Sequence, residues 1–171
     1  MDEVERKIVV VGDGGVGKTV WLKKIVTDAF CVRHVATLGV NVSTIHVPPT
    51  LNVAAPHISG VAIGLWDCAG VKEFSGRGDH SYIEADGAIV MFDLSDDRSY
   101  ESCGAWVDKV REMAGDIPIV LCGNKCDMEG MDIGAIALHR EKELTAYYSV
   151  SAKNNYNILK PIDALVDALG H

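Results

Sequence analysis

Eight residues near the N-terminus have the types and the spacing needed to hold a chain of phosphates. The stretch Gly12–Thr19 reads GDGGVGKT and fits the pattern G-x-x-x-x-G-K-[ST] at every fixed position. Its glycines let the backbone turn tightly and bring N–H groups close to an anion. Lys18 can then reach the β- and γ-phosphates, and the Thr19 hydroxyl can ligate Mg²⁺. The pattern predicts a nucleotide-phosphate site.

The elements that flank this stretch support the prediction. Arg6–Val11 ends in an unbroken apolar run, which predicts a strand buried on both faces. Val20–Thr27 follows as a predicted helix, so bound phosphates would lie at its positive N-terminus. The alternative, a glycine-rich turn without a ligand, is disfavoured by this order of strand, loop and helix.

Two later motifs indicate which base the nucleotide carries. Asn124–Asp127 follows the predicted strand Ile117–Cys122, and the Asp127 carboxylate can accept both N–H donors on the edge of guanine. Adenine does not offer this pair of donors, so it would leave the buried carboxylate unmatched. Ser151–Lys153 follows the last predicted strand and offers backbone N–H groups to the guanine oxygen. Each motif alone is weak, but both in this order are specific for guanine.

Further residues could hold Mg²⁺ and detect the γ-phosphate. Asp67 and Gly70 form the pattern D-x-x-G directly after a predicted strand. Asp67 would bind Mg²⁺ through water, and the Gly70 backbone N–H would contact the γ-phosphate. Thr37 could supply a second hydroxyl ligand from a loop that becomes ordered only when the γ-phosphate is present. Read alone, Thr37 would be an ordinary loop threonine.

Together these motifs resemble those of the Ras-like small GTPases, over nearly the whole chain. Three stretches that the general motifs do not require are similar to the Ran group of nuclear-transport GTPases, namely His34–Val40, Ile117–Lys125 and Ser151–Asn157. By this resemblance Asp28–Gly39 corresponds to switch I and Asp67–Tyr82 to switch II.

The resemblance implies GTP or GDP as ligand and Mg²⁺ as cofactor. The expected catalytic residues are Lys18, Thr37 and Gly70, and the expected metal ligands are Thr19, Thr37 and Asp67. Phe30 matches the aromatic residue that packs beside guanine. The expected nucleotide contacts are Gly14, Gly15, Val16, Gly17, Lys18, Thr19, Val20, Phe30, Thr37, Gly70, Asn124, Lys125, Asp127, Ser151, Ala152 and Lys153.

The largest departure from the family is at Val71. The family places at this position the glutamine that orients the attacking water, and this chain contains no glutamine at all. We therefore expect slow hydrolysis in a Ran-like switch, or alternatively a GTP-locked, non-cycling module that sequesters or mimics Ran partners. A phosphate-loop kinase or ATPase is disfavoured by Asn124–Asp127. Glu73 also departs, because the family has a basic residue there.

Composition predicts one domain over residues 1–171, which we expect to be monomeric. The formal net charge of −8 argues against direct binding to nucleic acid. Five scattered cysteines suggest reduced thiols. We expect no membrane anchor, because the apolar runs are short and lipidation motifs are absent. The resemblance implies an exchange factor, an activating protein and importin- or exportin-type receptors as partners, in nucleus and cytoplasm.

Strands that alternate with helices predict an α/β fold. We expect a P-loop NTPase G domain whose six-stranded, mostly parallel sheet has one antiparallel edge strand and helices on both faces. Ligands of such sheets bind at the carboxyl ends of the strands. The stretch Asp28–Gly39 is predicted to be irregular. Ser99 or Asp97 is predicted to cap one helix that runs to about Ala114, with Trp106, Val107 and Val110 on its apolar side. The predicted strands are 6–11, 40–47, 58–66, 88–93, 117–122 and 146–150, and the other predicted helices are 20–27 and 157–169.

Overall fold

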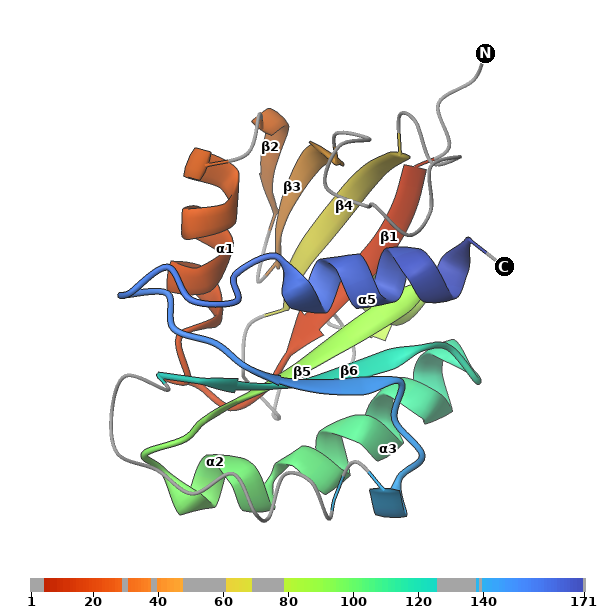
Figure 1. The fold of residues 1–171 in the computed structure, drawn as a ribbon. Coiled ribbons are helices and arrows are strands. Elements are labelled where there is room, and N and C mark those ends of the chain that lie inside the picture. The colour runs from red at the N-terminus through yellow and green to blue at the C-terminus, as the bar shows by residue number, and fades with distance from the viewer. Residues whose placement is uncertain are drawn as a thin grey trace.

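A central sheet of seven strands in the order β2-β3-β4-β1-β5-β6-β7 organises the protein (Figure 1). The structure, a computed structural model, describes residues 5–28, 31–37, 40–47, 61–68, 79–125, 138 and 140–170. Within these ranges, only the backbone is described at 27–28, 31–37, 40, 47, 61 and 79–80.

The described part of the chain alternates strands with helices. Its strands are β1 (Glu5–Val11), β2 (Cys31–Thr37), β3 (Val40–Val47), β4 (Val61–Cys68), β5 (Gly87–Asp93), β6 (Ile119–Asn124) and β7 (Ala146–Ser149). Its helices are α1 (Lys18–Asp28), the short 3₁₀ helix η2 (Asp79–Tyr82), α2 (Asp97–Glu101), α3 (Cys103–Ala114) and α5 (Lys160–Leu169). None of the helices in these ranges is long and apolar enough to cross a membrane.

The sheet is mostly parallel, as predicted. Strands β4, β1, β5, β6 and β7 pair in parallel, whereas β3 is antiparallel to both of its neighbours. Alternate residues of β1 enter different cores, with Ile8 and Val10 on one face of the sheet and Val9 and Val11 on the other. All four are fully buried, which explains why the second half of this strand has no polar face.

Helices cover both faces of the sheet (Figure 1). On one face α1 and α5 contribute Ile25, Ile162 and Leu165 to a core with β1, β5 and β6. On the other face α3 contributes Trp106 and Val110 to a second core. The predicted fold class is therefore confirmed.

Two details of the predicted sheet are wrong. The sheet has seven strands instead of six, because Cys31–Thr37, predicted to be irregular, pairs with β3 as the edge strand β2. The antiparallel strand β3 consequently lies inside the sheet and not at its edge. Edge pairing satisfies backbone N–H and C=O groups whatever the side-chain pattern, so alternation in the sequence was a poor guide here.

The helix predicted up to Ala114 is instead two helices, α2 and α3, which meet at Ser102. Neither predicted cap is used. Asp96 caps α2, with its carboxylate accepting from Arg98 N at 3.1 Å. The Ser99 hydroxyl donates instead to the Asp96 carbonyl at 2.7 Å. The last helix begins at Lys160, with Pro161 in its first turn, as expected of a residue without a backbone N–H.

Candidate nucleotide-binding site

The predicted phosphate loop connects β1 to α1, and its glycines are needed where neighbouring strands approach. Gly15 and Gly17 have φ of 82° and 94°, which few other residues adopt. A Cβ atom at Gly12 would collide with the Met91 carbonyl of β5, and one at Gly17 would collide with the Asn124 side chain. Gly14 and Gly15 are exposed, and no atom of the described residues would crowd a Cβ there. The loop is thus tightly packed at its ends and open in its middle.

Lys18 is buried, with only 6% of its surface exposed, and its ammonium is held by the loop itself. Nζ donates to the Gly12 carbonyl at 2.7 Å and to the Asp13 carbonyl at 2.8 Å. Because an ammonium has three N–H donors, one remains for a phosphate oxygen. Burial lowers the pKa of Lys18, and the charges of Asp67 and Asp13 oppose that shift. The loop carbonyls thus hold this positive charge in place, and its role beside the phosphates stays a prediction.

The two predicted metal ligands of the described part lie in direct contact. Thr19 Oγ1, in the first turn of α1, donates to Asp67 Oδ2, near the end of β4, at 2.8 Å. Hydroxyl and carboxylate oxygens are the ligands that Mg²⁺ prefers, so this pair fits a Mg²⁺ site completed by phosphates and water. A pocket of about 200 Å³ adjoins the pair, and it is lined by Thr19, Leu22, Lys23, Val26, Asn41, Ser43, Leu65 and Asp67.

Asn124 and Lys125 hold the phosphate loop from the neighbouring strand. The strand predicted to end at Cys122 extends to Asn124, which is 2% exposed. Asn124 Nδ2 donates to the Val16 carbonyl at 3.0 Å, and its Oδ1 accepts from Lys125 N at 2.8 Å. Lys125 Nζ donates to the Gly15 carbonyl at 3.3 Å. These two residues therefore brace the phosphate loop, and their predicted contact with the guanine base would be a second role.

Asp93 is a site residue that sequence reasoning missed. Its Oδ2 accepts from Lys125 Nζ at 2.6 Å, in an ion pair at the ends of β5 and β6. Burial alone would raise the pKa of Asp93, but hydrogen bonds from Lys125 and Ser95 outweigh it, and the pKa lies below its ordinary value. The only signal in the sequence was its place at the end of a buried strand.

The turn after β7 is built around Ser151, which is fully buried. Its backbone N–H donates to the Tyr156 carbonyl at 3.0 Å, and its hydroxyl accepts from Asn154 N at 3.1 Å. Just before it, Val150 N donates to the Gly123 carbonyl at 2.8 Å, which places the turn beside the end of β6. Ala152 is buried and Lys153 is exposed. The structure thus brings the second predicted base motif close to the first.

Several predicted site residues cannot be placed. Phe30, Gly70 and Asp127 lie outside the described residues, as does Val71. The backbone of Thr37 ends β2, but its side chain lies outside the description. Val20, in the first turn of α1, is 62% exposed and free to contact a ligand.

A tryptophan also contacts the phosphate loop, which the sequence did not indicate. Trp106 Nε1 donates to Asp13 Oδ1 at 2.9 Å, across 93 residues of chain. Helical periodicity had predicted only that Trp106 lies on the apolar side of its helix. The contact depends on how α3 packs against the sheet.

The family model of the Ras family matches residues 7–170 of this chain. The chain belongs to the Ras family. As a Ras-family small GTPase it is a GTP-binding protein of the P-loop fold, and such proteins bind GTP or GDP, typically with Mg²⁺. In this Ras-family chain the phosphate loop, the Thr19–Asp67 pair and the Asn124–Lys125 brace all lie at the carboxyl ends of the parallel strands.

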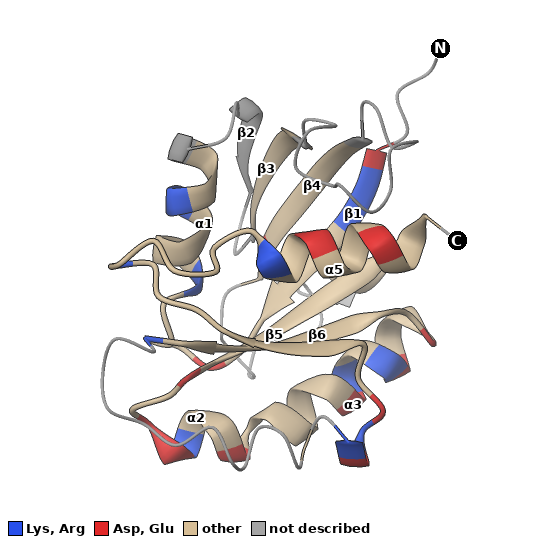
Figure 2. Ribbon diagram, in the orientation of Figure 1, with Lys and Arg blue, Asp and Glu red and all other residues tan. Residues whose placement is uncertain are grey.

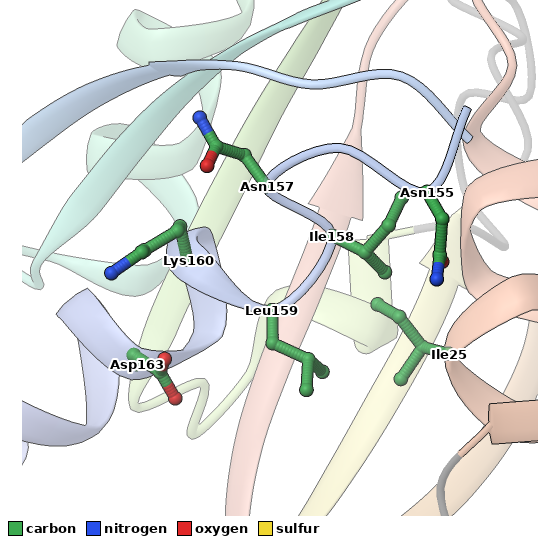
Figure 3. Close-up of a pocket in the computed structure, with 7 residues that line it drawn as sticks. All are labelled: Ile25, Asn155, Asn157, Ile158, Leu159, Lys160 and Asp163. Carbon is green, nitrogen blue, oxygen red and sulfur yellow. The ribbon is translucent and has the colours of Figure 1, made fainter. Parts of the chain in front are cut away.

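A second pocket of this Ras-family chain, of about 380 Å³, lies between α1 and the start of α5 (Figure 3). Ile25, Ile158 and Leu159 form its apolar part. Asn155, Asn157, Lys160 and Asp163 complete its lining. None of the predicted nucleotide contacts that the structure describes lines this pocket.

Proposed function

We propose that this protein is a Ran-like guanine-nucleotide switch that signals to nucleocytoplasmic transport factors and hydrolyses GTP slowly on its own. The Thr19–Asp67 contact at 2.8 Å carries the switch part of the proposal. It joins the phosphate loop to Asp67, the first residue of the segment that the resemblance assigns to switch II. A change of ligand at Thr19 would therefore act on that segment directly, through Asp67.

The residues of this chain would bind and orient the nucleotide. Lys18 places a buried positive charge beside the β- and γ-phosphates, and the loop N–H groups stabilise charge that develops on them. Thr19 and Asp67 would hold Mg²⁺, which supplies charge neutralisation at the phosphates. Asp127 would select guanine, and Thr37 and Gly70 would respond to the γ-phosphate.

Slow hydrolysis follows from Val71, which offers no donor or acceptor to the attacking water. Rates in this class are already on the order of 10⁻⁴ s⁻¹ when the glutamine is present. A further loss of roughly tenfold to a hundredfold corresponds to about 1.4 to 2.7 kcal/mol of barrier. We therefore expect Val71→Gln to raise single-turnover GTP hydrolysis at least several-fold and to leave GTP affinity nearly unchanged.

The matched control is Val71→Leu, which stays apolar and should remain as slow as the parent. If the parent already hydrolyses GTP as fast as the glutamine variant, another residue positions the water. The parent should also release guanine nucleotide when it is denatured after purification. Equal binding of ATP and GTP would contradict the guanine specificity assigned to Asp127.

A second candidate function is a GTP-locked binding module that does not cycle and that sequesters or mimics Ran partners. Val71, in a chain without any glutamine, favours it. Single-turnover hydrolysis with and without an activating protein separates the two candidates. A cycling switch accelerates with the activating protein, whereas a locked module retains GTP under both conditions.

The proposed partners follow from the resemblance to Ran. We propose that the protein binds an exchange factor, an activating protein and importin- or exportin-type receptors. We further propose that it is a monomer and that it acts in both nucleus and cytoplasm. Basic and acidic residues are interspersed along α2 and α3, and α5 carries Lys160, Asp163 and Asp167 (Figure 2). This mixed charge, with a net charge of −8, does not favour nucleic acid as a direct ligand. Receptor capture from nuclear extract by the GTP-loaded but not the GDP-loaded protein tests the proposal.

A further inference from the structure

A hydrogen bond connects helix α3 to the phosphate loop from the side of the second core. Trp106 Nε1 donates to Asp13 Oδ1 at 2.9 Å. Trp106 is 3% exposed and packs with Val107 and Val110 in the core under α3. Hydrogen bonds to an ionised group are stronger than neutral ones, and burial of the donor excludes competing water. The contact is therefore well placed to fix the side chain of Asp13.

Other neighbours also hold the indole ring of Trp106. Lys109 Nζ lies 5.6 Å from the centre of the Trp106 ring and 5.4 Å from that of Tyr82, in the geometry of cation–π contacts. Tyr82 belongs to η2 and is 3% exposed. The donor therefore belongs to a ring that is packed in the core under α3.

Asp13 is the one loop residue whose carboxylate could harm phosphate binding. A negative charge in the loop repels bound phosphates unless it is directed away from them. Burial raises the pKa of the Cys103 thiol on α3 to about 12, and the charge of Asp13 adds to that shift. Asp13 thus influences groups on α3, the side on which Trp106 holds it.

The backbone of the same residue acts on Lys18. The Asp13 carbonyl accepts from Lys18 Nζ at 2.8 Å. Side chain and carbonyl of one residue are joined through a single Cα, so a tether on the carboxylate restricts the carbonyl as well. Movement of Asp13 would therefore disturb the ammonium that faces the phosphates.

We propose that Trp106 is a positioning residue for the phosphate loop, whose indole N–H holds the Asp13 carboxylate on the α3 side and so keeps the loop and Lys18 in place for nucleotide. The proposal rests on the guanine-nucleotide binding described above. It adds a determinant of nucleotide residence time that lies on α3, outside the nucleotide-contact motifs.

The test compares two Trp→Phe variants that differ in one respect. Trp106→Phe keeps an aromatic ring but removes the N–H. Trp21→Phe is the matched control, because Trp21 is fully buried in the other core and its Nε1 has no hydrogen-bond partner among the residues that the structure describes. Both variants leave a similar gap in a core, but only one loses a hydrogen bond. The measurement is the release rate of fluorescent GDP from the full chain, with thermal unfolding recorded alongside.

We expect Trp106→Phe to release GDP about tenfold faster than the parent, which corresponds to about 1.4 kcal/mol. Trp21→Phe should release it at a rate within about twofold of the parent's. In an Asp13→Ala background, Trp106→Phe should cause no further acceleration. Equal release by Trp106→Phe and the parent would overturn the proposal, and so would an acceleration that persists undiminished without the Asp13 carboxylate.

A second pair of variants keeps the proposal testable if Trp106→Phe does not fold. Asp13→Asn retains an acceptor oxygen for the indole, whereas Asp13→Ala does not. We expect faster GDP release from the alanine variant than from the asparagine variant, and equal rates would count against the tether. The indole Nε1–H resonance of Trp106 should shift in Asp13→Ala while that of Trp21 stays in place.

Failure of the nucleotide function is visible separately. A parent that binds no guanine nucleotide refutes that function, and the positioning role with it. A parent that binds GDP normally, with no change in Trp106→Phe, refutes only the positioning role.

Discussion

The glycines of the phosphate loop differ from one another in what surrounds them. Gly12 and Gly17 leave no room for a Cβ, because Met91 and Asn124 approach the backbone there. A Cβ atom at Gly14 would have no atom of the described residues within 4 Å. The motif therefore contains glycines required by packing and glycines that leave space for a ligand.

This difference predicts unequal effects of the same substitution. Gly12 has a φ of 147°, and a Cβ atom there would collide with the Met91 carbonyl. We therefore expect Gly12→Ala to destabilise the fold by about 2 to 3 kcal/mol. In a domain of this size that lowers Tm by roughly 5 to 10 °C. Gly14→Ala is the matched control and should change Tm by no more than about 2 °C. Differential scanning fluorimetry measures both, and equal losses would contradict the assignment.

At the scale of elements, the ends of neighbouring strands determine which motifs meet. Asp93 of β5 pairs in register with Asn124 of β6, which places the Asp93 carboxylate beside Lys125. The Asp93 side chain is 9% exposed. Lys125, in turn, reaches the Gly15 carbonyl at 3.3 Å. Strand register therefore links an ion pair to the phosphate loop.

We expect Asp93→Asn to destabilise the fold by about 2 kcal/mol at pH 7, because it leaves Lys125 without its buried charge partner. The pKa of Asp93 is depressed in the folded state, so its stabilisation is present above the unfolded value near 3.8 and is lost as the pH falls through the folded pKa. The difference between parent and variant should therefore shrink below about pH 4. Urea unfolding at several pH values measures it.

Asp108→Asn is the control for this prediction. Its carboxylate also pairs with a lysine, at 3.0 Å from Lys142 Nζ, but the Asp108 side chain is 64% exposed. Exposed ion pairs contribute little, so the control should lose less than about 0.5 kcal/mol. Equal losses in the two variants would show that burial of Asp93 is unimportant.

At the scale of the whole molecule, the antiparallel side of the sheet carries the segments expected to respond to nucleotide. Among the described strands, β2 is the edge strand and pairs only with β3. It ends at Thr37, the residue assigned to the γ-phosphate. By contrast, β6 lies between two strands and is buried throughout. A change of nucleotide should therefore alter the stability of β2 more than that of β6.

We expect amide hydrogen exchange over Cys31–Thr37 to slow at least several-fold when GDP is replaced by a non-hydrolysable GTP analogue. The γ-phosphate and Mg²⁺ would engage Thr37 and stabilise the edge pairing of β2. Amides of Ile119–Asn124 are the internal control and should exchange equally in both states. The same exchange over Cys31–Thr37 with either nucleotide would argue against a working switch.

Much of the candidate site was predictable because its chemistry is encoded in short, contiguous stretches. Gly12–Thr19 needs its residue types for backbone geometry and phosphate contact, whatever lies elsewhere in the chain. Val40–Val47 was predicted with its observed bounds, because alternation marks a strand and Pro48 cannot continue the ladder. Thr19 and Asp67 were assigned to one metal from the sequence. The structure places their side chains in contact at 2.8 Å, and the metal itself stays a prediction.

Other features were decided only by the tertiary structure, because they depend on distant partners. Strand β2 forms because it pairs with β3, and its own side-chain pattern did not predict a strand. Asp93 joins the site through the register of β5 with β6, and Trp106 reaches Asp13 across 93 residues. A local pattern can specify which groups a segment offers. Which distant groups lie within hydrogen-bond distance of them is settled only when the helices and strands pack.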